Sequence, residues 1–231
     1  MLAERTRTHY REKLWRKILR DHIIVCGYGV KGQAAIETLL ATDRTPSEIV
    51  VIDARPDVVE EAGRSGFAGV VADASAKAAL EAAGIREAAA VIVAPDRDDT
   101  AVLITLTARE LNPRARIVAS VRQTENAHLL EQGGADSVVV SSGAAGRLLG
   151  HAVHSPRVVQ VLEDLLSVGS GLDIIEREVA DGDVGRPLAE IRSEAPVIAV
   201  VRGEHVLRFD DPRVGDLKAG DRLVCLCRSE S

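Results

Sequence analysis

Three glycines directly after a short apolar run are the first residues of this sequence whose spacing suggests chemistry. Gly27, Gly29 and Gly32 follow the apolar residues 23–25 and precede a stretch rich in helix-forming residues. In a strand–turn–helix unit, the first glycine permits a tight turn, the second lets a pyrophosphate approach the backbone, and the third lets the helix pack closely on the strand. The spacing therefore predicts a nucleotide-binding turn whose backbone amides face the phosphates.

Carboxylates follow at the ends of the next two apolar runs. Asp53 ends "EIVVID", 21 residues after Gly32. At that position a carboxylate accepts hydrogen bonds from the ribose hydroxyls of an adenosine and repels a 2′-phosphate, so NADP is disfavoured, although Arg55 softens that preference. Asp73 in "VVADAS" has two interpretations of equal weight. It contacts the ligand near the adenine, or it only caps the next helix.

Short β-branched runs alternate with helical stretches between residues 22 and 141. Strands are expected at 22–26, 49–53, 69–72, 91–94, 116–120 and 137–140. Helices are expected between them at 31–41, 57–65, 76–83, 99–111 and 124–132. Strands this apolar are covered on both faces. The pattern therefore predicts an α/β fold with a Rossmann-like, doubly wound parallel sheet.

After residue 141 the pattern changes. Two helices are expected in succession at 142–153 and 156–167, followed by a glycine-rich linker at 169–171. Strand-like runs follow at 173–179, 197–202, 205–209 and 222–227, with a hairpin turn in "RGEHV" and a short helix near 187–192. The expected parts are therefore a basic lead-in (1–20), a nucleotide-binding lobe (21–141), a helical crossover (142–168) and a small α+β lobe (169–231).

The two successive helices are more apolar than a helix pair on the edge of one small domain requires. Exposed aliphatic surface of this extent marks an interface, and the expected contact of these helices is with a second subunit in a two-fold homodimer. The residues concerned are Leu148, Leu149, Ala152, Val153, Val158, Val159, Val161, Leu162, Leu165 and Leu166. The alternative, in which both helices pack within their own subunit, remains open.

Composition excludes several classes of protein. A formal net charge of -6 and an aromatic content of 2% argue against a nucleic-acid partner, which needs a basic surface and often aromatic platforms. No apolar stretch approaches the roughly 20 residues that span a bilayer. The basic lead-in suits a helix near a partner or a membrane surface, or a solvated helix. Cys26, Cys225 and Cys227 make no disulfide framework and are expected to be small apolar residues of strands.

Groups for catalysis are harder to find than groups for binding. A dehydrogenase needs an acid or base beside a substrate pocket. His128, His151 and His154 fall on expected helices or in the connection between them, and His205 falls in the hairpin. The sequence shows no HExxH, CxxC or nucleophile-elbow motif. We therefore expect that the protein is not an enzyme and that it binds the nucleotide as a signal. The competing class is an NAD-dependent oxidoreductase with an unrecognised substrate site.

Five segments carry a resemblance to a known family, and together they span nearly all of the chain: "DHIIVCGYGVKGQAA", "VVADAS", "AVIVAPDRDDTAVLITLTARELNP", "VRQTENAHLLEQGGADSVVVSS" and "LKAGDRLVCL". They resemble the RCK (TrkA-N plus TrkA-C) modules that regulate potassium channels and Trk/Ktr uptake systems, especially those of prokaryotic, actinobacterial-type channels. The resemblance implies a ligand-sensing gating domain at the cytoplasmic face of the membrane. A detached Trk/Ktr regulatory subunit is the alternative within the same class.

The resemblance also implies ligands and partners. The N-lobe is expected to bind an adenine nucleotide (NAD or NADH, ATP, ADP or AMP), and the C-lobe is a candidate site for cyclic di-AMP. The helices over 142–168 are expected to form the dimer hinge, and the homodimers an octameric gating ring under the pore domain of a potassium channel. The lead-in over 1–20 resembles the linker that follows a pore helix.

Nucleotide contacts are implied by the resemblance at Gly27, Tyr28, Gly29, Val30, Lys31, Gly32, Asp53, Ala54, Arg55, Asp73, Ala74, Ala94 and Asp99. At Asp99 the family often places an acid near the phosphates or a bound cation, so a divalent cation or potassium is implied there. Family members that bind ATP tightly have arginine where this chain has Val30, so a preference for ATP is not implied. Calcium-gated members have acids where this chain has Ala94, Ser120 and Arg122, so no calcium site is expected at those strand ends.

Overall fold

The computed structural model describes residues 20–42, 44–169, 171–191 and 195–229. Contacts divide the chain into two compact units, with the boundary between Val153 and His154. This boundary lies inside the helical segment predicted over 142–168. The basic lead-in predicted over 1–20 lies outside the described residues except for Arg20, and Ser170 of the predicted linker also lies outside them.

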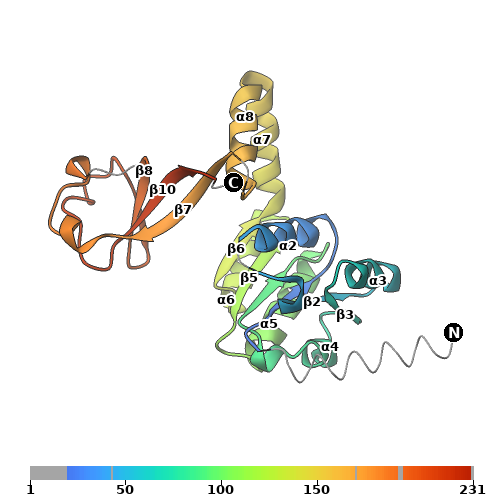
Figure 1. Cartoon of the computed structure of the whole chain (residues 1–231). Helices are drawn as coiled ribbons and strands as arrows, with labels where there is room; N and C mark the ends of the chain where they lie inside the picture. The colour runs from blue at the N-terminus through green and yellow to red at the C-terminus, as the bar shows by residue number, and fades with distance from the viewer. Residues whose placement is uncertain (1–19, 43, 170, 192–194, 230–231) are drawn as a thin grey trace. The chain divides into compact units, whose positions relative to one another are not determined.

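A six-stranded parallel sheet forms the first unit, with strand order β3-β2-β1-β4-β5-β6 (Figure 1). β1 lies between β2 and β4, and Ile23 pairs with Ile49 on one side and with Ala90 on the other. The strands are β1 (Ile23–Cys26), β2 (Ile49–Asp53), β3 (Ala68–Val71), β4 (Ala90–Val93), β5 (Arg116–Val121) and β6 (Ser137–Val140). The predicted Rossmann-like parallel sheet is confirmed.

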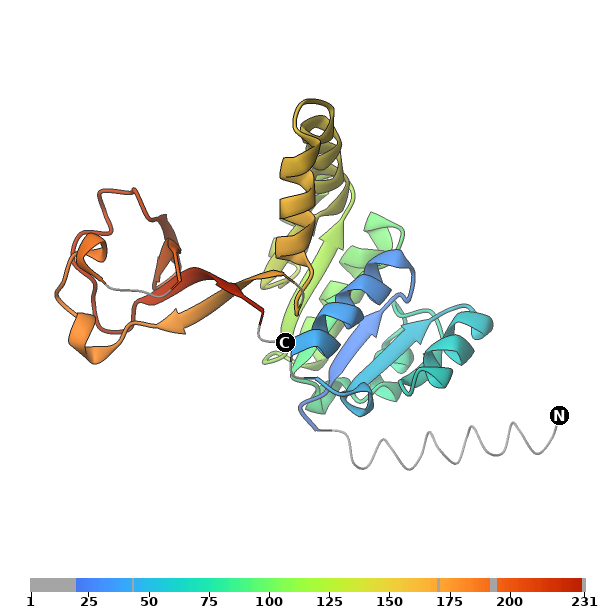
Figure 2. The same cartoon turned by 45° about the horizontal axis from the view of Figure 1, so that its top comes forward.

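Helices cover both faces of this sheet because alternate strand residues point to opposite sides. Ile23 and Val25 pack with Ile36 in the layer that contains α2 and α3, and Figure 2 shows α2 lying along that face. Ile24 and Cys26 belong to the opposite core, which contains α4, α5 and α6. The helices are α2 (Val30–Thr42), α3 (Pro56–Arg64), α4 (Lys77–Ala82), α5 (Asp98–Leu111) and α6 (Ala127–Gln132).

Two local features differ from the expectation. All of β1 and nearly all of β2 are buried, but Val71 in β3 and Val139 in β6 are about half exposed, because these strands lie at the edges of the sheet. The helix expected over 124–132 begins as a 3₁₀ turn at Thr124–Asn126. There Asn126 donates its side-chain amide to Asp98 at the start of α5, which holds the turn against that helix.

The second unit combines a helix with an antiparallel sheet. Helix α7 (Ser141–His154) ends at the boundary, α8 (Pro156–Leu166) follows, and the four strands have the order β7-β10-β8-β9. The strands are β7 (Leu172–Glu178), β8 (Val197–Arg202), β9 (His205–Arg208) and β10 (Arg222–Arg228). Arg202 pairs with His205 across the predicted hairpin turn. Among the described helices, none is both long and apolar enough to cross a membrane.

One ion pair organises the long connection between β9 and β10. Arg202 at the end of β8 donates from Nε and Nη2 to the carboxylate of Asp221, over 2.9 and 2.7 Å. The same guanidinium donates to the carbonyls of Arg213, Val214 and Asp216. The Asp221 side chain is 1% exposed, and the hydrogen bonds from Arg202 lower its pKa despite burial. Arg202 therefore holds the connection to the core of the second unit.

Replacing Arg202 tests this role. Arg202→Met leaves the Asp221 carboxylate buried without its partner, and breaking a buried pair in this way costs about 3–5 kcal/mol of unfolding free energy. The control is Arg208→Met in the same unit, because the Arg208–Asp210 pair is exposed and contributes little to stability. Urea denaturation, monitored through the amide signals of β8 and β10, measures the unfolding free energy of both variants. Equal losses in the two variants would contradict the role of Arg202.

Candidate nucleotide-binding site

The glycine turn leaves no room for side chains at two of its three glycines. Gly27 has a φ of 96°, and a Cβ there would lie 2.7 Å from the carbonyl oxygen of Ala94. A Cβ at Gly32 would lie 2.0 Å from the carbonyl oxygen of Gly27. Nothing lies within 4 Å of a Cβ at Gly29. The first and third glycines are therefore required by the fold, and the second leaves open space where a ligand can approach.

A pocket of about 280 Å³ lies at the carboxyl ends of β1, β2, β3 and β4. The strand order reverses between β1 and β4, which is where doubly wound sheets bind ligands. Eight of the predicted site residues line this pocket: Gly27, Gly29, Asp53, Ala54, Arg55, Asp73, Ala74 and Ala94. The remaining lining residues are Cys26, Ile52, Ala72, Pro95, Asp96, Thr100 and Ile104.

The carboxylate of Asp53 already accepts three hydrogen bonds. Its Oδ2 accepts from the amide of Tyr28 over 2.9 Å, and its Oδ1 accepts from the amide and Nε of Arg55 over 3.0 and 3.3 Å. Burial raises the pKa of Asp53, but these bonds outweigh it and the pKa is lowered. Each oxygen has two lone pairs. One ribose hydroxyl can therefore bind at Oδ2 directly, and a second must displace the exposed Arg55 guanidinium from Oδ1.

Asp73 shows features of both of its interpretations. Its Oδ1 accepts hydrogen bonds from the amide and the hydroxyl of Ser75, over 2.9 and 2.8 Å, which stabilises the turn before α4. The residue also lines the pocket beside Asp53. The bonds from the described residues all reach Oδ1. A role in the turn therefore does not prevent Oδ2 from meeting a ligand.

Five predicted site residues do not line this pocket. Tyr28 is buried against Phe67, with ring centroids 6.1 Å apart, and contributes its backbone amide to Asp53. Val30 is 86% exposed, and Gly32 is buried under the turn. Lys31 lies on the first turn of α2, but its ammonium reaches the ends of β4 and β5. There it donates to the carbonyl of Pro95 over 2.6 Å and to the hydroxyl of Ser120 over 2.9 Å.

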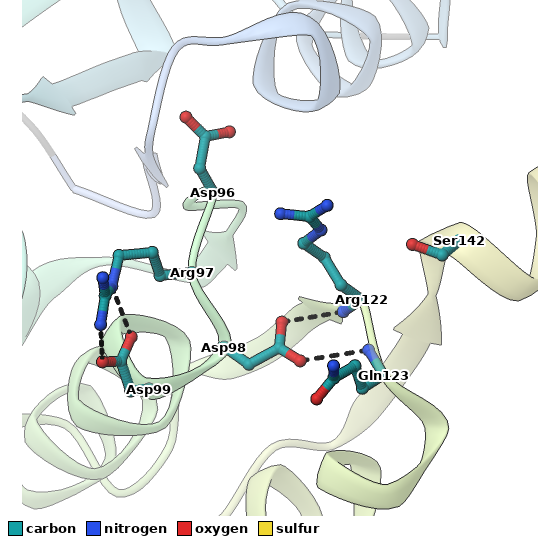
Figure 3. Close-up of a pocket in the computed structure, with 7 residues that line it drawn as sticks. All are labelled: Asp96, Arg97, Asp98, Asp99, Arg122, Gln123 and Ser142. Atoms are coloured by element: carbon teal, nitrogen blue, oxygen red, sulfur yellow. Dashed lines mark hydrogen bonds and ion pairs between the residues drawn. The ribbon is translucent and has the colours of Figure 1, made fainter.

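Asp99, the fifth, lines a second pocket of about 560 Å³ (Figure 3). The carboxylate accepts hydrogen bonds from the guanidinium of Arg97 and the amide of Thr100, which lower the pKa of Asp99 to about 2. No group of three or more potential metal ligands occurs among the residues the structure describes. A cation held by Asp99 and a phosphate, and the lack of calcium binding at Ala94, Ser120 and Arg122, stay predictions.

The second pocket is lined by several residues that the sequence did not single out. Besides Asp99 and Arg122, the lining consists of Asp96, Arg97, Asp98, Gln123 and Ser142. Asp98 accepts from the amides of Arg122 and Gln123, which ties the start of α5 to the end of β5. Asp96 lines both pockets. Its place three residues after the end of β4 was the available signal, since the carboxyl ends of parallel strands meet at one edge of the sheet.

A glycine turn after β1, an acid at the end of β2 and a pocket at the reversal of strand order define a Rossmann-like nucleotide-binding module. Residues 23–141 match the model of the TrkA-N domain, and because this match covers more than half of the chain, the chain belongs to the TrkA-N family. The resemblance to RCK modules is confirmed in this part of the chain.

Two similar proteins are archaeal potassium channels. "Potassium channel protein 1" of Methanocaldococcus jannaschii is 26% identical over 87% of this chain and 63% of its own length. "Calcium-gated potassium channel TvoK" of Thermoplasma volcanium is 25% identical over 93% of this chain and 64% of its own length. The chain thus spans less than two thirds of the length of either relative.

Solved structures agree with these relatives. The GsuK RCK domain is 27% identical, with a TM-score of 0.51 over 90% of this chain and 44% of that chain. The GsuK channel bound to NAD is also 27% identical, with a TM-score of 0.50 over 89% of this chain and 36% of that chain.

The two later glycines of the turn should respond differently to substitution. Gly32→Ala places a Cβ against the Gly27 carbonyl, so α2 must move away from β1, and overpacking of this kind costs about 1–3 kcal/mol of unfolding free energy. Gly29→Ala meets nothing within 4 Å and should leave the melting temperature unchanged while weakening nucleotide binding. Thermal melting with calorimetric titration separates the effects. A Gly32→Ala protein as stable as wild type would contradict the close approach.

Proposed function

We propose that this chain is the ligand-sensing domain of a potassium channel, in which an adenine nucleotide bound at the reversal of strand order changes the opening of the pore. The observation that carries the proposal is the pocket that combines the open backbone at Gly29 with the carboxylate of Asp53. The similar channel proteins supply the second support. The domain acts at the cytoplasmic face of the membrane, where it senses the nucleotide.

The proposed ligand is an adenine nucleotide with a free ribose 2′-hydroxyl, such as NAD or ADP. Asp53 Oδ2 has a lone pair available for that hydroxyl, and the negative charge of the carboxylate opposes a 2′-phosphate. The NAD in the similar GsuK channel structure supports the same class of ligand.

The nucleotide is bound without chemical conversion. In the described part of the chain no histidine lines either pocket. Cys26 lines the first pocket, but burial raises the pKa of its thiol to about 12, so it is neutral and a poor nucleophile at physiological pH. Of the acids that line the first pocket, Asp53 is held by a hydrogen bond from the glycine turn and Asp73 by hydrogen bonds from Ser75, and Asp96 also lines the second pocket. These groups suit binding and orientation of a ligand.

Helices α7 and α8 supply the proposed assembly surface. Neither helix contains a buried residue. Their large apolar side chains with high exposure are Leu149, Val153, Val158, Val161 and Leu166. Apolar surface of this extent marks an interface. We propose that these helices form a homodimer, that four dimers form an octameric ring, and that the ring acts on the channel pore.

Nucleotide binding should depend on Asp53. Asp53→Ala removes the acceptor of the ribose hydroxyl, and we expect calorimetry to show NAD and ADP binding weakened by about 1–3 kcal/mol. Asp57→Ala, on the exposed first turn of α3, is the matched control and should bind like wild type. Equal affinity in wild type and Asp53→Ala would exclude this site. Sustained oxidation of NADH with a simple carbonyl substrate would exclude a purely sensory role.

The dimer can be tested on highly exposed residues whose substitution spares the fold of each unit. Leu149→Asp with Leu166→Asp changes side chains that are 71% and 68% exposed, so the monomer should stay folded. Two unpaired carboxylates in an apolar interface cost several kcal/mol, and light scattering should show monomers. Val206→Asp in β9, at 68% exposure, is the control and should remain dimeric. A monomeric wild type at tens of micromolar would contradict the proposal.

A further inference from the structure

The ammonium of Lys31 can donate one more hydrogen bond than the two it makes within the protein. It is half-buried and donates to two neutral oxygens, the carbonyl of Pro95 and the hydroxyl of Ser120. Burial lowers the pKa of Lys31, the charges of Asp96 and Asp98 oppose that effect, and the charge of Arg122 adds to it. An ammonium carries three protons. With two of them used, the third can be donated to an anionic group of a ligand.

Arg122 adds a second cation at the same edge of the sheet. It follows β5 directly, and its backbone amide is held by Asp98. In Figure 3 its guanidinium extends away from the Asp98 carboxylate, on the side of Asp96. By contrast Arg97, which lines the same pocket, is already paired with Asp99 through two hydrogen bonds. The guanidinium available to a ligand in this pocket is therefore that of Arg122.

The two pockets adjoin at the residues that follow β4. Pro95 lines the first pocket and accepts the hydrogen bond from Lys31, and Asp96 lines both pockets. Lys31 is two residues beyond Gly29, where the backbone is open to a phosphate. The first pocket, at about 280 Å³, is slightly smaller than the 300–1,000 Å³ typical of ligand sites. A nucleotide with more than one phosphate needs further space, and the second pocket, lined by Arg122, provides it.

We propose that Lys31 and Arg122 bind the second phosphate of an adenine nucleotide whose adenosine lies beside Asp53, so that the chain distinguishes a diphosphate from a monophosphate. This inference rests on the proposed nucleotide function. The shared chemistry is the diphosphate, which occurs both in ADP and in the pyrophosphate of NAD.

The charges around this subsite explain why the phosphate must be tethered. Asp96 and Asp98 offset the charges of Lys31 and Arg122, so the empty subsite is nearly neutral and attracts a free anion weakly. A phosphate attached to a bound adenosine has a high effective concentration at the subsite. Inorganic phosphate alone should therefore bind far more weakly than the second phosphate of ADP.

Calorimetric titration of the whole chain with AMP, ADP, NAD and inorganic phosphate tests the proposal. Wild type should bind ADP and NAD about tenfold or more tightly than AMP, as expected for hydrogen bonds to charged groups. Lys31→Met and Arg122→Gln should each remove most of that difference and leave AMP affinity within about twofold of wild type. Arg64→Gln, on the exposed surface of α3 and in neither pocket, is the control and should bind every ligand like wild type.

Several outcomes would overturn the subsite. One is equal affinity of wild type for AMP and ADP. Another is a loss of affinity in both variants that is the same for AMP and ADP. The third is that inorganic phosphate binds as tightly as ADP. If AMP still binds and depends on Asp53, the proposed function stands without the subsite. If no nucleotide binds, both fail. If Lys31→Met melts at a lower temperature than wild type, the binding data of Arg122→Gln decide whether the subsite exists. The Arg122 side chain extends from an exposed loop, so its substitution should not affect stability.

Discussion

The close approach of α2 to β1 is the constraint on which the rest of this site depends. The chain turns so tightly after Cys26 that a side chain at Gly32 would overlap the carbonyl of Gly27, and one at Gly27 would press on Ala94. These contacts bring the start of α2 to the carboxyl ends of β1 and β4. From the first turn of that helix, Lys31 reaches across to the ends of β4 and β5. Packing and ligand geometry thus share one cause.

Asp53 is a structural residue of the glycine turn and also the residue we propose to bind the ribose. Its hydrogen bond from Tyr28 connects the end of β2 to the glycine turn, so the turn is held in place before a ligand arrives. Its Oδ2 keeps one lone pair free for a ligand. Its Oδ1 accepts two hydrogen bonds from Arg55, so a ligand must displace one of them to bind there. Binding at a preformed site costs less conformational entropy than binding at a site that the ligand must first order. This arrangement suits a sensor, in which binding must respond to the concentration of the nucleotide.

The second unit reaches stability by different means. Its apolar core is small, and the ion pair between Arg202 and the buried carboxylate of Asp221 closes the long connection that precedes β10. Helices α7 and α8, on either side of the boundary between the units, have no buried residue. Amphipathic helices owe most of their stability to packing of the apolar face. These two helices therefore present apolar side chains that the described residues leave exposed, which is why we propose them as the assembly surface.

The sequence determined the elements and the glycine turn, because both depend on local spacing. Periodicity predicted all six strands of the first sheet within one or two residues of their bounds, and the positions of Gly27, Gly32 and Asp53 followed from the strand before them. Periodicity could not show that the segment over 124–132 begins as a 3₁₀ turn bonded to Asp98, because Asp98 lies 28 residues from Asn126 in the chain.

Only the tertiary structure decided which distant side chains meet. β4 lies next to β1 in the sheet although two strands separate them in the chain, and this order brings Lys31 to Pro95 and Ser120. The sequence likewise suggested Asp99 but did not suggest that Asp96 lies between two pockets. Local patterns fix where a strand begins and ends, whereas strand order arises from the packing of the whole sheet. Contacts across the sheet edge are therefore absent from any short stretch of sequence.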